Sequence, residues 1–115
     1  MKKVTAHQKG LDAENWAALF LLLKGYWVIE RRYRTPLGEI DIVARRGNTL
    51  VFAEVKMRKQ GQDAAAAINS VNQERVRRAA ELYLQKYPRY TVHDIRLDAI
   101  VMSPWSWPQH ILNAF

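Results

Sequence analysis

The sequence contains no cysteine among its 115 residues. This absence excludes a disulfide framework and a zinc site with thiolate ligands. Long apolar runs are also lacking: the longest, residues 16–23, is far shorter than the roughly 20 residues that span a bilayer. The two lysines near the start are not followed by the apolar segment of a secretory signal. We therefore expect a cytoplasmic protein without a membrane span.

The length predicts a single domain over residues 1–115. Hydrophobic residues make up 49% of it, which is enough for one compact core. Because a domain of this size buries only about two-thirds of its unfolded surface, the core is modest and a homodimer is an option. Eighteen Lys and Arg against 11 Asp and Glu give a formal net charge of +7. This excess favours an anionic partner, nucleic acid or an acidic membrane surface, over a charge that serves solubility alone.

The first half of the chain has the pattern of one helix and three strands. Apolar periodicity predicts a helix over residues 5–24, which Gly25 ends. Three strands follow at 26–34, 39–45 and 49–57, and the turns between them are short enough for an antiparallel meander. The expected apolar stripe of the helix consists of Ala13, Trp16, Ala17, Phe20, Leu23 and Lys24.

In the second half, helix and strand alternate. Residues 64–68 begin a helix that breaks near Asn69, and the capping-box spacing of Ser70 and Gln73 predicts the main second helix over 71–87. A fourth strand covers 94–102, and residues 110–115 form a last edge strand. The long crossover from the third strand to the fourth suits a parallel pairing with the helix packed across the sheet. The order indicates an α/β fold.

Charged residues occupy two adjacent predicted strands, where a small protein is expected to bury apolar side chains. Glu39 and Asp41 share one face of the first strand, and Glu54 and Lys56 share one face of the second. Carboxylates flanked by aliphatic residues cost desolvation free energy unless something compensates. A divalent metal ion would compensate, because Mg²⁺ prefers oxygen ligands and needs only one or two carboxylates plus a substrate phosphate.

Asp41 is followed, after twelve intervening residues, by Glu54-Val55-Lys56. In a chain with 25% charged residues this spacing alone is a weak signal, and the placement on neighbouring strands is the stronger one. A lysine beside a metal can orient or help deprotonate its bound water, or stabilise charge on a scissile phosphate. These parts favour metal-assisted phosphodiester hydrolysis. On the first helix, Glu14 lies on the buried side or at its border; from the helix alone, a rim glutamate that reaches solvent is the favoured alternative.

Five motifs together resemble the YraN-like family of small bacterial proteins thought to be endonucleases. They are Gly10-x-x-x-Glu14, Gly38-Glu-Ile-Asp-Ile-Val-Ala44, Glu54-Val-Lys-x-Arg58, Arg96-Leu-Asp98 and His110-Ile-Leu-Asn-Ala-Phe115. The family is related to archaeal Holliday-junction resolvases within the PD-(D/E)xK nuclease superfamily. The resemblance covers nearly the whole chain and implies a restriction-endonuclease-like αβββαβ core, with a mixed central sheet flanked by helices.

The resemblance also implies roles for individual residues. Asp41, Glu54 and Glu14 would be the catalytic acids that hold Mg²⁺ or Mn²⁺, helped by the backbone carbonyl of Val55, and Lys56 would be the catalytic lysine. Glu39 would be an acid behind the metal ligands or a residue of the hairpin. Gln73 would lie near the active site, with the capping box as its equally weighted alternative, and Asn72 stands where a lysine is expected.

The basic residues point to DNA as the partner. Nine of the eighteen lysines and arginines lie between Lys24 and Lys59, and three arginines cluster on the second helix. Without a recognition helix, selectivity would come from DNA shape, such as branches or flaps. The alternative for each arginine singly is a solvated surface charge. The expected nucleic-acid contacts are Arg31, Arg32, Arg34, Arg45, Arg58, Gln73, Arg75 and Arg78.

Other residues are left with open or no roles. Trp105 and Trp107 could stack on bases or seal a dimer contact, but packing on the protein's own body is favoured. The three histidines show no ligand spacing and are assigned no role. The leading hypothesis is therefore a Mg²⁺- or Mn²⁺-dependent endonuclease acting on branched or structured DNA. The alternatives are a nucleic-acid-binding module that cleaves nothing and a structural partner of an acidic protein.

Overall fold

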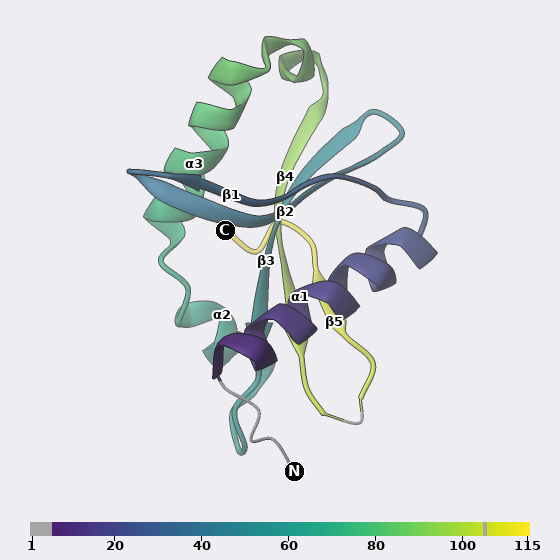
Figure 1. The fold of residues 1–115 in the computed structure, drawn as a ribbon, viewed down its shortest axis with the longest axis vertical. Helices are drawn as coiled ribbons and strands as arrows, with labels where there is room; N and C mark the ends of the chain where they lie inside the picture. Colours follow the sequence, from purple (N-terminus) through teal and green to yellow (C-terminus); the bar gives the residue numbers. More distant parts are fainter. Residues whose placement is uncertain (1–5, 105) are drawn as a thin grey trace.

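The computed structural model describes residues 6–104 and 106–115, with side chains from residue 12 onward. A five-stranded sheet in the order β1-β2-β3-β4-β5 forms its centre. Helix α1 packs on one face of the sheet and α3 on the other (Figure 1). The elements are α1 (Ala6–Leu23), β1 (Trp27–Thr35), β2 (Gly38–Arg46), β3 (Thr49–Met57), α2 (Ala64–Asn69), α3 (Gln73–Lys86), the 3-10 helix η1 (Pro88–Val92), β4 (Asp94–Met102) and β5 (Gln109–Ile111).

The strand pairing confirms the predicted topology. Strands β1, β2 and β3 form an antiparallel meander, and β4 pairs with β3 in parallel after the crossover through α2 and α3. The predicted last strand over 110–115 is too long, because β5 covers only Gln109–Ile111. Beyond it the chain turns at Asn113, whose φ is +51°, and the N–H of Ala114 donates to the carbonyl of Leu97 at 2.8 Å.

Helix α1 contacts the sheet through small side chains. Ala13, Ala17 and Leu21, spaced four residues apart, are buried against the sheet. The wider stripe expected from the sequence is wrong at three positions, since Trp16 is 63% exposed, Leu23 is 74% exposed and Lys24 is also exposed. Alanine side chains let the helix lie close to the sheet, so the larger residues beside them face outward. No helix formed by the described residues is long and apolar enough to cross a membrane.

The C-terminus of α1 confirms the predicted stop at Gly25. Gly25 has a φ of +89°, and its N–H donates to the carbonyl of Leu22 at 3.0 Å. The N–H of Tyr26 donates to the carbonyl of Leu21 at 2.9 Å, which completes a Schellman motif. This cap turns the chain directly into β1, so the helix and the first strand are fixed relative to each other.

The N-terminus of α3 differs from the predicted capping box. Asn72 is the cap, and its side-chain oxygen accepts a hydrogen bond from the N–H of Arg75 at 3.3 Å. Ser70 instead ends α2, and its hydroxyl donates to the carbonyl of Ala67 at 2.6 Å. The capping role of Gln73 is therefore wrong: it is the first residue of α3, and its Oε1 accepts from the guanidinium of Arg77 at 3.3 Å.

Helix α3 approaches β2 so closely that only glycine fits at the contact. A Cβ atom at Gly38 would lie 1.8 Å from the main-chain oxygen of Arg75. This contact fixes the first turn of α3 against the start of β2, three residues from Asp41. The backbone of α3 thus anchors the start of the strand that carries the first candidate acid.

Candidate active site

Strands β2 and β3 separate where the candidate acids lie. The last paired residues of their ladder are Ile42 and Ala53. Beyond this pair, β2 continues to Gly38 beside β1, while β3 continues to Met57 beside β4. Figure 1 shows the β1–β2 pair running away from β3 and β4 at this point. Asp41 and Glu54 are the first residues past the last pair, so they lie in the fork between the diverging strands.

Side chains replace the backbone ladder in the fork. The N–H of Asp41 donates to Oε1 of Glu54 at 3.3 Å, and the N–H of Val55 donates to Oδ2 of Asp41 at 2.7 Å. Each acid therefore accepts a hydrogen bond from the main chain of the opposite strand. This reciprocal arrangement brings the two predicted metal ligands together and holds both carboxylates at the same end of the ladder.

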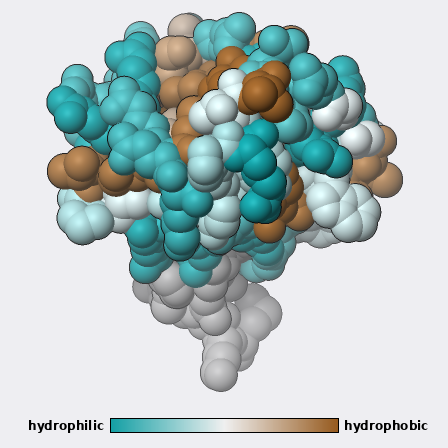
Figure 2. Space-filling view, turned by 90° about the horizontal axis from the view of Figure 1, so that it is seen from above, coloured by the Kyte–Doolittle hydropathy of each residue, from teal (hydrophilic) through white to brown (hydrophobic). Residues whose placement is uncertain are grey.

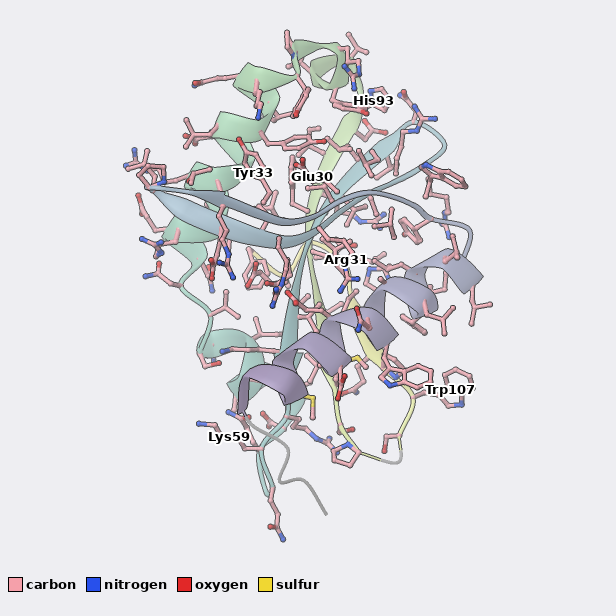
Figure 3. All side chains as sticks on the ribbon, viewed as in Figure 1. Glu30, Arg31, Tyr33, Lys59, His93 and Trp107 are labelled. Atoms are coloured by element: carbon pink, nitrogen blue, oxygen red, sulfur yellow. The ribbon has the colours of Figure 1, made fainter. Side chains whose placement is uncertain are left out.

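Strand alternation is interrupted on both strands at the level of Asp41. Ile42 packs in the core on the α1 side, whereas Ile40 packs on the α3 side. On β1, Arg32 has a φ of +56° and lies between Arg31, paired with Ile42, and Tyr33, paired with Ile40. Figure 3 shows the Arg31 side chain on the α1 side of the β1–β2 pair and Tyr33 on the other side. A residue in the left-handed region breaks the period of two, and here it lies across from Asp41.

The environment of the fork raises the pKa of both acids. Burial is the main cause for Asp41, whose pKa rises to about 6 although the hydrogen bond from Val55 opposes the rise. Burial and then the charge of Asp41 raise the pKa of Glu54 to about 9. Glu14 and Glu39 add like charge. Half-buried carboxylates that repel one another lack compensating positive charge, which is the situation that a bound cation relieves.

Glu14 reaches the fork from α1 and is buried, with only 8% of its surface exposed. The alternative of a solvent-reaching rim glutamate is therefore wrong. Its carboxylate contributes to the raised pKa of Asp41, and its Oε2 accepts a hydrogen bond from Nε of Arg32 at 2.9 Å. The three acids predicted to cooperate thus lie in one region, but Glu14 is engaged by an arginine.

Lys56 lies two residues after Glu54 on β3. Both point to the same side of β3 by alternation, opposite to Val55, which packs against the core on the α1 side. Lys56 is half-buried and forms no ion pair with either acid of the fork among the residues that the structure describes. Glu39 is 58% exposed and lies 3.7 Å from Arg34 across the hairpin, which matches its alternative as a hairpin residue.

The oxygen atoms that the fork offers are of the type that a hard divalent cation prefers as ligands. Asp41 and Glu54 offer carboxylate oxygens, and their raised pKa values indicate a strong local need for positive charge. Within residues 12–104 and 106–115, no three His, Asp or Glu side chains converge as a ready metal cluster. The third acid, Glu14, lies beside Asp41 and shares its carboxylate with the guanidinium of Arg32.

The predicted nucleic-acid contacts are spread over several elements. Arg31, Arg34, Arg45, Arg75 and Arg78 are exposed. Arg45 lies near the far end of β2, opposite Leu50, and Arg78 forms an ion pair with Glu74 at 3.1 Å. In the view of Figure 2, hydrophilic residues cover most of the visible face, with hydrophobic residues in separate groups. The arginines therefore form a dispersed basic surface rather than one focused pocket.

The remaining residues that the sequence suggested as nucleic-acid contacts lie in different environments. Arg58 is half-buried, and its N–H donates to the carbonyl of Met102 at 2.7 Å. Gln73 lies at the start of α3 and contacts Arg77 rather than the acids. Trp107 is 81% exposed beside the outer face of α1 (Figure 3), so the favoured packing on the protein's own body is wrong for it. Trp105 lies outside the described residues.

The structure reveals a second polar cluster that the sequence reasoning missed. Asp98 is fully buried in β4, and its oxygens accept hydrogen bonds from Arg96 at 2.9 Å, His110 at 2.7 Å and the N–H of Asn113 at 3.0 Å. Burial alone would raise the pKa of Asp98, but these hydrogen bonds hold it below its usual value. The assignment of no role to His110 is therefore wrong. The motif residues Arg96, Asp98 and His110 were the available signal.

The hydrogen bonds of this cluster determine which ring nitrogen of His110 carries the proton. Nζ of Lys24 lies 2.7 Å from Nδ1 of His110, and an ammonium group can only donate. Nδ1 must therefore accept, which leaves Nε2 to donate to Asp98. Arg96 also donates to the hydroxyl of Tyr26 at 2.6 Å. The cluster joins the C-terminal end of α1, strand β4 and the C-terminal segment. Because these hydrogen bonds occupy the oxygens of Asp98, the acid has little capacity left to bind a metal.

Comparisons with known proteins agree with this fold. The model of a family described as uncharacterised protein family UPF0102 matches residues 13–102. A UPF0102 protein of Nitrobacter winogradskyi is 45% identical over 113 residues, which cover 98% of this chain and 96% of that protein. A second, from Bradyrhizobium diazoefficiens, is 45% identical over 114 residues, covering 99% of this chain and 86% of that protein.

One similar solved structure is that of Archaeoglobus fulgidus Hjc, a Holliday junction resolvase from an archaeal hyperthermophile. The TM-score is 0.54 at 20% sequence identity, and the match covers 90% of this chain and 71% of that chain. At this identity the likeness shows the fold alone, and it confirms the resolvase-like αβββαβ core. The chain thus belongs to the uncharacterised protein family UPF0102, the YraN-like family that its motifs indicate.

Proposed function

We propose that this protein is a divalent-metal-dependent endonuclease that hydrolyses phosphodiester bonds of DNA, with branched or structured DNA as the favoured substrate. The observation that carries the proposal is the pairing of Asp41 and Glu54 in the fork between β2 and β3. Two half-buried acids with raised pKa values destabilise the fold when both ionise, so a purely structural role gives no reason for them.

The residues of the fork take the roles that their positions allow. Asp41 and Glu54 would hold Mg²⁺ or Mn²⁺ together with the backbone carbonyl of Val55, with Glu14 as a further acid. The metal would neutralise charge on the phosphate and lower the pKa of a bound water. Lys56, on the same side of β3 as Glu54, would orient the attacking water or stabilise the phosphate.

Hydrolysis then needs little further chemistry from the protein. The oxygen of water forms a new bond to phosphorus while one ester P–O bond breaks. The water loses a proton, and the leaving oxygen takes one up to become a hydroxyl. Positioning and electrostatic stabilisation are the contributions that the fork can supply.

DNA is the partner that the charge favours. The net charge of +7 and the exposed arginines on β1, β2 and α3 would contact phosphates without reading sequence. The expected consequence is an affinity that falls steeply with salt. Preference for branched DNA would come from its shape, because the sequence shows no recognition-helix motif.

A cleavage assay tests the proposal directly. Holliday-junction, flap, single-stranded and linear duplex DNA are incubated with the protein in Mg²⁺ or Mn²⁺ and in EDTA. We expect metal-dependent cleavage, fastest on branched substrates. Asp41→Asn, Glu54→Gln and Lys56→Ala are each expected to lower the rate by about 100-fold or more, by loss of metal ligation or charge stabilisation.

Asp94→Asn is the matched control for these variants. Asp94 is an exposed acid at the start of β4, paired with Thr49 at the other end of the sheet from the fork. Its substitution changes the net charge as much as Asp41→Asn does, without touching the site. Cleavage that survives in Asp41→Asn, or that falls equally in Asp94→Asn, would contradict the assignment of the fork as the active site.

The second candidate is a nucleic-acid-binding protein that keeps the fold but does not cleave. The specific observation that favours it is the ion pair between Glu14 and Arg32, which occupies one of the three acids. Binding of junction DNA by the wild-type protein, without cleavage of any substrate in either metal, would support this candidate over the enzyme.

A further inference from the structure

The contact between Arg32 and Glu14 stands out among the interactions of the fork. Nε of Arg32 lies 2.9 Å from Oε2 of Glu14, and the side chains are 34% and 11% exposed. Among the described residues, Arg32 is the one basic side chain in ion-pair contact with any of the three acids Glu14, Asp41 and Glu54. The positive charge in direct contact with these acids thus comes from Arg32.

Arg32 reaches Glu14 from an unfavourable backbone conformation. Its φ of +56° lies in the left-handed region, which disfavours residues with a Cβ atom, and it occurs in the middle of β1. The neighbours on either side are held by pairs with Ile42 and Ile40. A strained residue that persists at a candidate site is a reason to look for a functional cause.

We infer that Arg32 acts as a latch on the metal site: it competes with a divalent cation for the Glu14 carboxylate, so a cation that recruits Glu14 displaces the guanidinium. This inference rests on the proposed function, because it assumes that the fork binds a cation. It adds a regulatory step, in which Arg32 compensates part of the acidic charge until the cation arrives.

The charges of the fork support an exchange of this kind. The guanidinium neutralises one carboxylate, while Asp41 and Glu54 remain without an ion-pair partner among the described residues. A divalent cation at Asp41 and Glu54 would attract the carboxylate of Glu14 and repel the guanidinium of Arg32. The displaced guanidinium would then lie beside the site, where a substrate phosphate can accept its hydrogen bonds.

Calorimetric titration with Mn²⁺ alone, without DNA, tests the latch. If Arg32 competes with the cation for Glu14, Arg32→Gln is expected to tighten Mn²⁺ binding by about two- to fivefold, the range of a partly exposed ion pair. Arg31→Gln is the matched control, since it removes the same charge from the neighbouring residue of β1, which forms no ion pair among the described residues. It is expected to change the affinity less.

The same titration in a Glu14→Gln background separates competition from a general field effect. Without the Glu14 carboxylate, a competing Arg32 has nothing to occupy, so adding Arg32→Gln should leave the Mn²⁺ affinity unchanged. A field effect of the Arg32 charge on Asp41 and Glu54 would instead persist. Equal tightening in both backgrounds, or no tightening by Arg32→Gln alone, would overturn the latch.

Arg32→Gly guards against a variant that fails to fold. Glycine adopts a positive φ without strain, so this substitution keeps the backbone of β1 while removing the guanidinium. It should tighten Mn²⁺ binding as Arg32→Gln does, and weaker binding by a folded Arg32→Gly would also overturn the latch. Failure of the wild-type protein to bind Mn²⁺ at all would contradict the proposed function itself, which distinguishes the two failures.

Discussion

The main-chain N–H of Asp41 donates to the carboxylate of Glu54 at the point where β2 and β3 part. In an uninterrupted antiparallel ladder that N–H would face solvent or a backbone carbonyl, and the two carboxylates would stand on strands paired along their length. The fork replaces this pairing with contacts from side chain to backbone. The register of the ladder already places Asp41 opposite Glu54, and the opening of the sheet lets each carboxylate accept a hydrogen bond from the main chain of the other strand.

The first prediction concerns the pH dependence of stability in EDTA. The pKa values of Asp41 and Glu54 are raised in the folded protein, to about 6 and about 9, so the folded state binds more protons than the unfolded state. Their contribution therefore makes the free energy of unfolding fall as the pH rises from about 4 to about 9. Urea unfolding at a series of pH values measures this slope.

Glu54→Gln provides the comparison for that slope. The amide oxygen can still accept from the N–H of Asp41, but the side chain no longer ionises. We expect this variant to have a flatter profile and, at pH 8, a melting temperature raised by about 4 °C or more. A profile as steep as that of the wild-type protein would show that the fork does not carry the pH dependence.

The second prediction is that a divalent cation stabilises the protein. Because the cation relieves the repulsion between Asp41 and Glu54, Mn²⁺ in large excess should raise the melting temperature at pH 7, and EDTA should reverse the effect. Differential scanning calorimetry measures it. Asp41→Asn should lose most of the increase, whereas the exposed control Asp94→Asn should keep it.

The third prediction concerns the buried cluster at Asp98. Asp98→Asn leaves Arg96, 17% exposed in its side chain, without its carboxylate partner, so we expect a loss of about 3 kcal/mol in the free energy of unfolding. Because the pKa of Asp98 is lowered, its contribution is present at neutral pH and is lost as the pH falls through that value. Urea unfolding of both proteins at pH 7 measures the loss, and the same measurement at lower pH should show a smaller difference.

His110→Ala examines the same cluster from the C-terminal segment. It removes the 2.7 Å hydrogen bond to Asp98 and is expected to destabilise the protein by about 2 kcal/mol. Hydrogen exchange should also show faster opening of β5 than of the central strands. Wild-type stability in this variant would contradict the role of the cluster in fastening that segment.

The fourth prediction compares two glycines. Gly38→Ala places a Cβ atom 1.8 Å from the main-chain oxygen of Arg75, so α3 or β2 must move, and we expect a loss of about 3 kcal/mol or more. Gly47→Ala, in the β2–β3 turn, has open space and only the strain of a φ of +59°, so about 1 kcal/mol is expected. Urea unfolding of both variants decides; equal losses would contradict the close contact of α3.

Much of the fold was predictable from local sequence. Gly25 indicated the end of α1, the short turns indicated the meander, and the long segment before Asp94 indicated a crossover to a parallel strand. These are properties of neighbouring residues, which act through backbone conformation and periodicity. Capping was less predictable, because Ser70 and Asn72 both offer a side-chain oxygen and only the end of α2 decides between them.

The site was predictable in its members but not in its contacts. Asp41, Glu54, Lys56 and Glu14 could be named from pattern and resemblance. The ion pair of Glu14 with Arg32 could not be predicted, because it depends on the positive φ of Arg32. Nothing in the residue types of β1 indicates that conformation. His110 was missed for a similar reason: its partner Asp98 is distant in sequence, and only the pairing of β5 with β4 brings them together.

The sequence by itself determined the order of elements, the basic charge and the set of acids, because each follows from composition and local spacing. The tertiary structure alone decided that β2 and β3 part beside Asp41 and that Arg32 turns to Glu14. It also decided that Asp98 is buried with its partners rather than exposed. Local pattern fixes which residues are available, whereas strand divergence and long-range packing fix which of them meet.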